Sequence, residues 1–554
     1  MKSAAETASE PRPAVSPTEK SGPNRSLRWC EFGLCMAITC FIVACHIVFW
    51  SHRGGLWRDE VQIVNISLSP TFSEFWRDLA IDTFPALWPA AVKCWTMICG
   101  DSDGSLRVLG LLIGLAVLAS VWYAVWQVGG GFPVLALALF ALCPTVIRYG
   151  DAVRGYGLGL VFLLIMYARI WKAAAAPTLR NVLLGMLAAL AAVQAMYFSA
   201  ALLPALGAAS AAIGLRRRTW KPALAAAGTG LPAAVSLLIY ADPILRQNQW
   251  HDVMRFELSL PWVAQKVCEA TNTAGRLSIY VWLGVTVLVV AAATHAVARG
   301  PRGRDAVVFA SVAIVAGIAC YLAFIFGVSQ RTNTWYYTPL MAFLAVSFDA
   351  AFAAGRFGRL FRLCGAALLV LLTAPTVWIA CQARMTNVDL IARTLEEKAR
   401  EDDLIVVMPW WPGVTFERYY HGKAPWTTLP DFGRLRVQRY DLLQQRMAEP
   451  EPIRPVLENI MAALRGGHRL WLVGGLAQSR SHPGEVMRLS EAPRNVQQGA
   501  GGRRNSTSYQ TVWCEQMTYV ILHHSRRGEV VGAGAGEQVS EFEKPTLFLF
   551  QGWQ

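Results

Sequence analysis

Charged residues are scarce in this chain of 554 residues: Asp, Glu, Lys and Arg together make up 16% of it. An ordinary soluble domain carries about 25%. Hydrophobic residues reach 54%, and the mean hydropathy is +0.35. This shortage of charge argues against a soluble or disordered protein and favours one that crosses a membrane several times.

The sequence also lacks any C-x-x-C pair, although it contains 12 cysteines. That spacing is typical of zinc and redox sites, so neither is indicated. Most of the cysteines lie in apolar runs, where a thiol behaves as a small apolar group. Cys268 and Cys514 are expected on the oxidising side of the membrane, and the sequence leaves open whether they pair.

The first 26 residues contain no apolar run and are rich in Pro, Ser, Ala and Glu. They predict a disordered cytoplasmic tail rather than a secretory signal, whose apolar core would begin nearer the start. The first apolar run begins near Gly33 and ends in the bulky pair Phe49-Trp50, which indicates a retained membrane helix.

Eleven apolar runs approach the length of about twenty residues that a bilayer core requires. Together they predict a helical membrane domain over residues 27–381. The runs are 33–50, 105–127, 132–148, 155–172, 180–197, 199–215, 223–240, 277–298, 306–327, 336–354 and 363–381.

The charges between these runs predict how the chain is oriented. Basic residues concentrate in the loops that a cytoplasmic N-terminus would place inside, whereas the loop 51–104 carries more acids than bases. Positive charge is retained on the cytoplasmic side. The pattern predicts an odd number of spans and an outer, periplasm-like location for residues 382–554. The composition, rich in Ala and Arg, suggests a bacterial inner membrane.

Residues 382–554 have the composition of a small α/β domain. We expect helices at 388–403 and 453–465 and strands at 403–411 and 468–476. A loop is expected at 494–508, followed by two late strands, WCEQMTYVILHH and KPTLFLFQGW.

The net charge of +14 raises the question of whether the protein binds nucleic acid. Residues 382–554 contain 21 basic and 19 acidic residues, so the excess lies in the hydrophobic part. Nucleic-acid binding needs a clustered basic face, which this distribution does not predict.

The first outer loop contains the strongest candidate for chemistry. Asp59 and Glu60 follow the first helix closely, and the stretch up to Ala80 has the spacing of an interfacial helix. A second short apolar helix, 82–100, contains Lys93. Adjacent carboxylates outside a membrane helix are usually hydrated charges, but a positioned one can act as a general base.

Two further segments are expected at the same membrane face. CPTVIRYGDAVRGYGLGL (143–160) and SQRTNTWYYTPL (329–340) join guanidiniums to a carboxylate and several phenols. The simple interpretation is snorkelling arginines and an aromatic belt. The alternative is a cavity wall that binds phosphate, for which the planar fork of Arg is suited. The residues are Arg148, Asp151, Arg154, Tyr156, Arg331, Tyr336 and Tyr337.

The order of these segments resembles the GT-C membrane glycosyltransferases, of the protein-mannosyltransferase, aminoarabinose-transferase and galacturonosyltransferase-like types. The resemblance rests on Arg-Asp-Glu after the first helix, an amphipathic segment, an x-Pro-x-Leu helix, GDSDGSLR, and Arg-Tyr-x-x-x-x-Arg-x-Tyr. It covers roughly residues 30–345. Relatives often have Lys or His before Pro-Pro-Leu, where this chain has Phe84-Pro85-Ala86-Leu87.

The resemblance implies sugar transfer from a polyprenyl-phosphate donor to a lipid, glycan or protein acceptor, with inversion at the anomeric carbon. Asp59 then resembles the catalytic base, with Glu60 its neighbour, and Asp151 matches the carboxylate of the second outer loop. Arg154 and Arg331 would hold the donor phosphate, and Lys93 would replace the missing basic residue. No cofactor is implied with certainty, and a divalent metal stays open.

Two other classes of function compete with this interpretation. A secondary transporter or flippase usually shows internal repeats and broken helices at the membrane midplane. The sequence shows no such repeat, and its candidate acids lie in outer loops rather than within spans. Asp349, near the inner end of the span 336–354, is the exception, and hydration at a helix end explains it. A non-catalytic scaffold whose outer domain binds polysaccharide is the third possibility.

Overall fold

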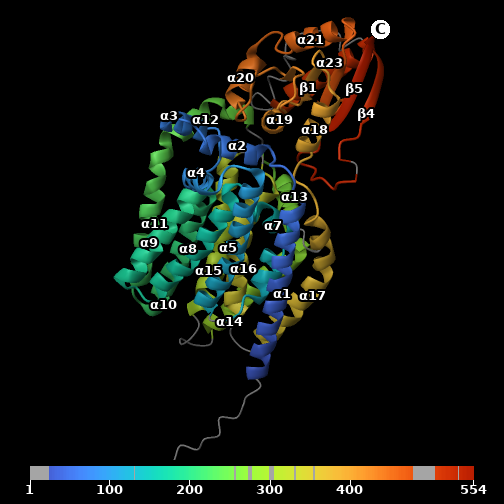
Figure 1. Ribbon diagram of the computed structural model, residues 1–554. Coiled ribbons are helices and arrows are strands. Elements are labelled where there is room, and N and C mark those ends of the chain that lie inside the picture. The colour runs from blue at the N-terminus through green and yellow to red at the C-terminus, as the bar shows by residue number, and fades with distance from the viewer. Residues whose placement is uncertain are drawn as a thin grey trace, which may run out of the picture.

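A computed structural model gives the fold of this chain (Figure 1). It describes residues 24–129, 131–254, 258–271, 278–298, 305–329, 332–352, 356–477, 506–534 and 536–554. Within these ranges the protein is a bundle of long helices with a small α/β domain at one end. The predicted class, a helical multi-pass membrane protein with a C-terminal α/β domain, is confirmed. We call this domain the outer domain after its predicted location, which stays a prediction.

Seven helical segments of the described part are long and apolar enough to cross a membrane. They are Ser26–His52 in α1 (Asn24–His52), α5 (Asp103–Gly129), α8 (Gly155–Ala175), Tyr197–Arg217 including α10 (Leu203–Arg217), Lys221–Gln247 including α11 (Lys221–Ser236) and α12 (Ala241–Met254), α15 (Asp305–Val328), and Gly358–Ala380 in α17 (Arg356–Ala380).

The other predicted spans are not among these seven segments. Helices α9 (Leu179–Ala195), α14 (Ser278–Ala298) and α16 (Thr338–Phe352) coincide with three of them. The sequence predicts one helix over the run 132–148, and this prediction is wrong. It consists of α6 (Val134–Ala136), a π-helical turn over Leu137–Ala141, and α7 (Pro144–Gly150).

Pro144 explains where the run 132–148 breaks. Proline has no N–H and pushes the residue before it towards extended backbone, and Cys143 has φ −71° and ψ 129°. At the other end, Asp349 accepts hydrogen bonds from the amides of Leu135 and Ala136 at 3.1 and 2.7 Å. Asp349 also pairs with Arg362, so this buried acid serves the fold of α6.

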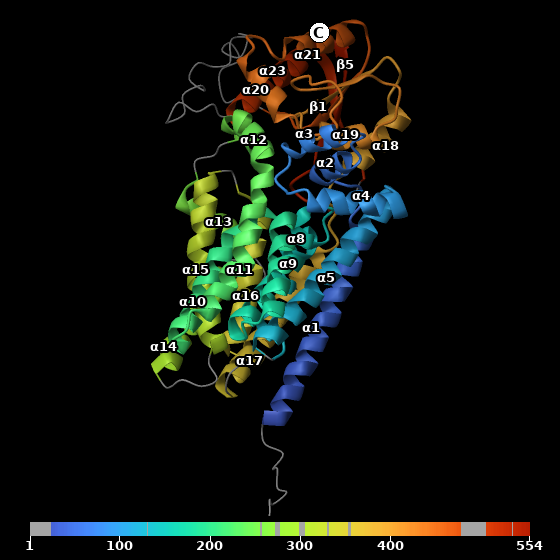
Figure 2. The same ribbon diagram turned by 90° about the vertical axis from the view of Figure 1, so that its left-hand side faces the viewer.

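The first outer loop forms three short helices across the end of the bundle: α2 (Arg58–Ser67), α3 (Phe72–Leu79) and α4 (Leu87–Cys99). The sequence predicts two, so the interfacial stretch up to Ala80 is divided into α2 and α3. Figure 2 shows them between the long helices and the outer domain. Thr71 begins α3 by accepting a hydrogen bond from the Glu74 amide at 3.2 Å. A short helix, α13 (Leu260–Ala270), lies near the same end.

The outer domain is built on a five-stranded sheet of order β2-β1-β3-β5-β4. The strands are β1 (Leu404–Met408), β2 (Trp426–Thr428), β3 (Leu470–Gly474), β4 (Ser525–Val531) and β5 (Thr546–Trp553). The first three are parallel, and β5 is antiparallel to β3 and β4. The predicted strands 403–411, 468–476 and KPTLFLFQGW are confirmed.

Helices cover both faces of this sheet: α18 (Val388–Lys398), α19 (Gly413–Tyr419), α20 (Tyr440–Ala448), α21 (Arg454–Arg465) and α23 (Ser506–His524). The predicted strand WCEQMTYVILHH is wrong, because this segment belongs to α23. The reason is the spacing of its large buried residues. Tyr509, Trp513, Met517 and Ile521 recur every four positions, which places them on one helical face.

The outer domain and the first outer loop share one hydrophobic core. Val61 and Val64 of α2 belong to the same buried cluster as Val406 and Leu472 of the sheet. Burying apolar surface contributes a free energy of about 25 cal/mol per Å², so this continuous core attaches the outer domain firmly to the loop. The outer domain therefore rests directly on the loop that contains the predicted catalytic acids.

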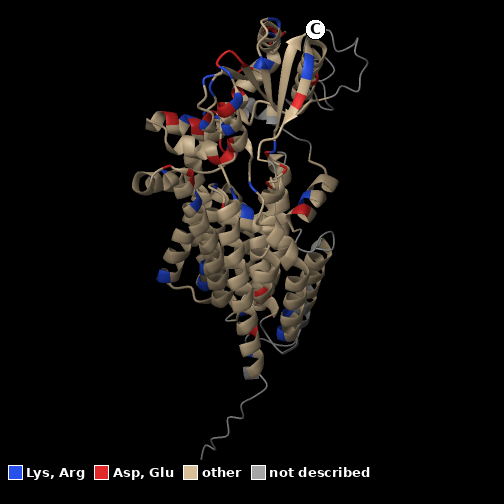
Figure 3. Ribbon diagram, turned by 45° about the vertical axis from the view of Figure 1, so that its right-hand side comes forward, with Lys and Arg blue, Asp and Glu red and all other residues tan. Residues whose placement is uncertain are grey.

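Charged residues gather where the bundle meets the outer domain, whereas the middle of the bundle carries few (Figure 3). All twelve cysteines lie in the described part of the chain and are free, so Cys268 and Cys514 are not joined. Much of the predicted N-terminal tail and of the predicted loop 494–508 lies outside the described residues.

Candidate functional site

Glu60 occupies a buried network of ion pairs at the start of α2. Its side chain is fully buried and pairs with Arg53 and with Arg107 of α5, whose Nη1 lies 3.1 and 3.0 Å from the two carboxylate oxygens. Burial opposes ionisation of Glu60, but the guanidiniums of Arg107 and Arg53 outweigh it and hold its pKa below the usual value.

The Glu60 network joins three parts of the chain. Besides the two arginines, Glu60 accepts hydrogen bonds from the amides of Val153 at 2.8 Å and Trp57 at 3.2 Å. It thereby ties the loop after α1 to α5 and to the turn before α8. These segments contain the motifs that were compared in the sequence, and Glu60 holds them together.

Asp151 faces α1 rather than Asp59. Its Oδ1 lies 2.7 Å from Nδ1 of His46, and both side chains are buried. Gly110 and Gly114 of α5 allow this close packing. A Cβ added at Gly110 would lie 2.0 Å from the Asp151 carbonyl oxygen, and one at Gly114 would lie 1.7 Å from Oδ1.

Asp59 is partly open, in contrast to the other carboxylates. Its side chain is 18% exposed, against none for Glu60 and 2% for Asp151. Arg58 Nε donates to Asp59 Oδ1 at 3.3 Å, and Nε2 of Gln438 donates to the same oxygen at 2.9 Å. The side chain of Arg58 is 21% exposed, so both members of this pair can meet a ligand.

Arg154 lies beside Asp59 but is already paired. Its Nη1 donates to the Asp59 carbonyl oxygen and to Asp82 Oδ2, both at 3.1 Å, and Nη2 lies 3.1 Å from Asp82 Oδ1. Burial raises the pKa of Asp82 above its usual value in spite of this partner. The Arg154 guanidinium also lies over the ring of Phe84, 5.0 Å from the ring centroid, which is within the distance of about 6 Å typical of a cation–π contact.

Aromatic side chains form a wall next to these charges. Tyr156 meets Phe84 edge to face at 4.7 Å between ring centroids, and it lies 6.4 Å from both Tyr149 and Tyr336. Burial raises the pKa of Tyr336 above its usual value, and the neighbouring carboxylate of Asp59 acts in the same direction. Tyr336 therefore keeps its hydroxyl proton at neutral pH.

The remaining predicted site residues lie apart from this cluster or outside the described residues. Arg148 donates from Nη2 to the Ala380 carbonyl at 3.3 Å, at the end of α17. Tyr337 is buried, and its hydroxyl lies 2.9 Å from that of Thr332. Lys93 is exposed on α4. Arg331 lies outside the described residues.

Several polar residues of the site were not identified from the sequence. The GDSDGSLR motif, which contains Arg107, was the only feature of the sequence that could have pointed to this residue. A contact between residues distant in the chain leaves no pattern in the sequence. The residues are Arg53, Arg58, Asp82, Arg107, His46, Gln438, Tyr440 and Glu543.

Glu543 reaches the site from the C-terminal segment of the chain. Its buried carboxylate accepts hydrogen bonds from the Arg58 amide at 3.3 Å and from the Thr415 hydroxyl at 3.0 Å. Burial raises its pKa to about 7, which Arg58 opposes. The group lies at the N-terminus of α2, where backbone N–H groups favour an anion.

Among the described residues, no three His, Cys, Asp or Glu side chains gather closely enough to hold a metal ion. Involvement of a divalent metal stays open. The described residues of the site offer one partly exposed carboxylate, one partly exposed guanidinium and a paired guanidinium, next to aromatic rings.

No protein-family model and no curated protein matches this sequence. Solved structures similar to it include ArnT from Cupriavidus metallidurans, bound to undecaprenyl phosphate and in the apo state. The identities are 13% and 14% and the TM-scores 0.44 and 0.47; each match covers 78% of this chain and 92% of the other. Scores below 0.5 are too low for this likeness to bear on function.

Proposed function

We propose that this protein is a GT-C-type membrane glycosyltransferase. It transfers a sugar from a polyprenyl-phosphate donor to a hydroxyl of a lipid, glycan or protein at the outer face of a bacterial inner membrane. The observation that carries the proposal is the state of Asp59. Of the three predicted catalytic carboxylates, Asp59, Glu60 and Asp151, it is the one that is partly exposed and also has arginine neighbours.

The proposed chemistry assigns the proton to Asp59. A hydroxyl acceptor is a poor nucleophile near neutral pH, so a carboxylate that accepts its proton assists the reaction. The acceptor oxygen forms a bond to the anomeric carbon while the bond from that carbon to the phosphate oxygen breaks. The electron pair of that bond leaves with the polyprenyl phosphate, and the configuration inverts.

The leaving phosphate gains charge as this bond breaks, so cationic groups near it lower the barrier. Arg58 suits this role because its side chain is partly exposed and its pairing with Asp59 is a long contact of 3.3 Å. Arg154 is more constrained, since both its terminal nitrogens already bind Asp82. We therefore place the donor phosphate at Arg58 first and at Arg154 second.

The aromatic wall fits the sugar. Rings of Tyr, Trp and Phe offer apolar faces with polar edges, and the Tyr336 hydroxyl remains a donor at neutral pH. Tyr336 is partly exposed, whereas Tyr156 and Phe84 are buried next to it and beside Arg154. A sugar held against Tyr336 would therefore have its phosphate near the guanidiniums. The structure around Asp59 thus supports both halves of a donor substrate.

Mass spectrometry of envelope lipids and glycans from a gene-deletion strain tests the function. We expect a mass corresponding to one sugar to disappear and to return when the gene is supplied again. The missing mass identifies donor sugar and acceptor together. An unchanged set of glycans, with a lipid or sugar accumulating on one side of the membrane, would favour a transporter or flippase instead.

Reporter fusions test the proposed orientation. Fusions after Asp59 and Arg400 should report the outside, and a fusion after Arg217 should report the cytoplasm, as the basic residues of the inner loops predict. A cytoplasmic signal at Arg400 would place the outer domain on the cytoplasmic side of the membrane, away from the proposed donor. That result would contradict the proposed architecture.

A further inference from the structure

We infer that Gln438, supplied by the outer domain, is a positioning residue that orients Asp59 for proton transfer. This inference rests on the proposed function and extends it, because it gives the outer domain a part in the active site. Gln438 precedes α20 and lies 379 residues from Asp59 in the chain.

Two hydrogen bonds hold Gln438 against α2. Its side-chain Nε2 donates to Asp59 Oδ1 at 2.9 Å, and its backbone amide donates to Oε1 of Gln62 at 2.9 Å. Gln438 itself is 5% exposed. A buried side chain with fixed backbone has little freedom, so it can hold the carboxylate in one rotamer.

The orientation of the Gln438 amide follows from its neighbours. An ionised carboxylate accepts hydrogen bonds and donates none, so the amide must turn its NH₂ group towards Asp59. Its Oε1 then faces Tyr440, whose hydroxyl donates to it at 2.6 Å. Burial raises the pKa of Tyr440 to about 12, so this phenol remains a donor at neutral pH.

The two donors that hold Asp59 both bind Oδ1. They are Gln438 Nε2 and Arg58 Nε, and no described residue donates to Oδ2. One oxygen is thus used for orientation and the other remains for the proton of the acceptor. A general base needs this arrangement, because it must reach its proton at hydrogen-bond distance.

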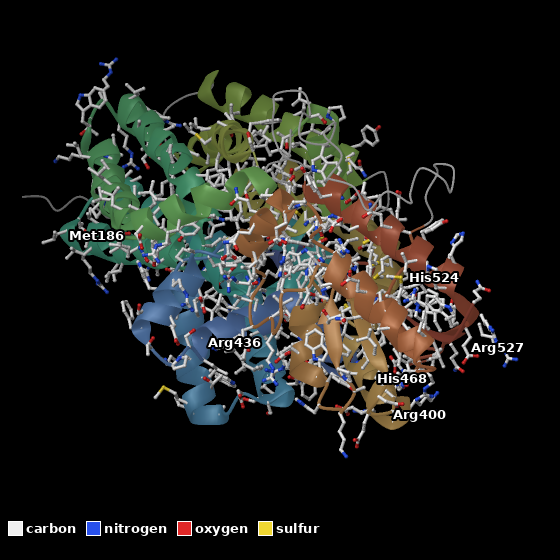
Figure 4. The ribbon with its side chains drawn as sticks, turned by 90° about the horizontal axis from the view of Figure 1, so that it is seen from above. Met186, Arg400, Arg436, His468, His524 and Arg527 are labelled. Atoms are coloured by element: carbon white, nitrogen blue, oxygen red, sulfur yellow. The ribbon has the colours of Figure 1, made fainter. Side chains whose placement is uncertain are left out.

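A second contact between the same segment and α2 provides a matched control. Asn65 Nδ2 donates to the Arg436 carbonyl at 2.7 Å, and Arg436 Nη2 donates to the Asn65 carbonyl at 3.2 Å. Figure 4, seen from above, shows Arg436 beside the ribbon of the first outer loop. Asn65→Ala removes a side-chain bond of the same interface without touching Asp59.

The experiment compares Gln438→Ala, Gln438→Glu and Tyr440→Phe with Asn65→Ala. Purified variants are added to detergent-dispersed membranes of the deletion strain, which supply donor and acceptor. The added sugar mass is followed from pH 5 to 9 at limiting and saturating amounts of these membranes. Thermal unfolding of each variant is recorded beside it.

We expect Gln438→Ala to lower kcat about tenfold, the effect of one lost hydrogen bond to a charged group, with KM nearly unchanged. Gln438→Glu should move the acidic limb of the pH profile upwards by one unit or more, because two facing carboxylates share a proton. Tyr440→Phe should have a smaller effect, because the amide of Gln438 loses the donor that fixes its oxygen. Asn65→Ala should keep the wild-type profile.

The results separate this inference from the proposed function. Active wild-type protein, together with Gln438 variants whose kcat and pH profile equal those of Asn65→Ala, would overturn the role of Gln438 alone. Wild-type protein that adds no sugar would overturn the proposed function and this inference with it. If the Gln438 variants fail to fold, Tyr440→Phe decides: a wild-type kcat and pH profile would overturn the inference.

Discussion

Asp59 and Glu60 are adjacent in the sequence, yet they lie in two different regions of the molecule. Glu60 is fully buried between Arg53 and Arg107, whereas Asp59 is 18% exposed beside Arg58 and Gln438. On a helix, neighbouring residues point about 100° apart, so one can turn into the bundle and the other towards the outer domain. The Glu60 region therefore holds the fold together, and the Asp59 region is open to a substrate.

In the proposed function, this short acidic motif combines stability and chemistry. The Glu60 network fixes the start of α2 on α5 and on the turn before α8, and it thereby fixes the position of Asp59. The outer domain then completes the surroundings of Asp59 with Gln438 and Glu543. A substitution at either acid is expected to abolish function, but for different reasons that can be measured separately.

The largest expected effect is on stability, from Glu60→Gln. The substitution leaves Arg53 and Arg107 buried with a neutral partner, and breaking a buried ion pair costs about 3–5 kcal/mol. We expect poor expression and a clearly lower melting temperature of the purified protein. A variant with wild-type melting temperature but no activity would move Glu60 from the structural region to the chemical one.

The next effect is the pH dependence that Glu543 gives to stability. Its pKa in the folded protein is raised to about 7, against 4.5 as its ordinary value. Ionisation therefore destabilises the folded state, with no cost below about pH 4.5 and the full cost above about pH 7. A shift of this size corresponds to roughly 3 kcal/mol.

Glu543→Gln should remove this pH dependence. The variant should match the wild type near pH 4.5 and exceed its melting temperature increasingly up to pH 7. The effect of Glu60 on stability has the opposite sign, because its pKa is lowered in the folded protein. Its ionised form stabilises the fold at a pH above its ordinary pKa, and this contribution is lost as the pH falls. If the melting temperatures of the wild type and of Glu543→Gln change with pH in the same way across this range, the raised pKa of Glu543 is contradicted.

A smaller effect is expected on donor binding, from Arg58→Ala. Losing a charged hydrogen bond to phosphate costs about 1.5–3 kcal/mol, which is roughly tenfold or more in affinity. Arg58→Lys should recover part of it, because an ammonium lacks the bidentate fork. Binding of undecaprenyl phosphate to purified protein measures this.

Arg154→Ala sharpens the same comparison. It should weaken undecaprenyl phosphate binding and also lower the melting temperature, because it leaves the buried Asp82 without its partner. Arg58 is partly exposed, so Arg58→Ala should leave the melting temperature near that of the wild type. Unchanged binding in both variants would mean that neither arginine meets the donor.

The sequence predicts the membrane helices and the first outer loop well, because long apolar runs and amphipathic spacing depend on local composition. It predicts poorly where contacts are distant. Nothing near Glu60 shows that Arg107 pairs with it, and nothing in the outer domain marks Gln438 or Glu543 as neighbours of α2. The segment of α23 misleads because its aromatic and β-branched residues suit a strand, although Tyr509, Trp513, Met517 and Ile521 follow a helical spacing.

The most direct test of the account is the transfer rate of Asp59→Asn. The change is nearly isosteric, keeps an acceptor for Gln438 and Arg58, and removes the base. We expect a loss of about 10²–10⁴-fold in the rate of sugar transfer, with expression and melting temperature near those of the wild type. Full transfer activity of purified Asp59→Asn would contradict the assignment of the base.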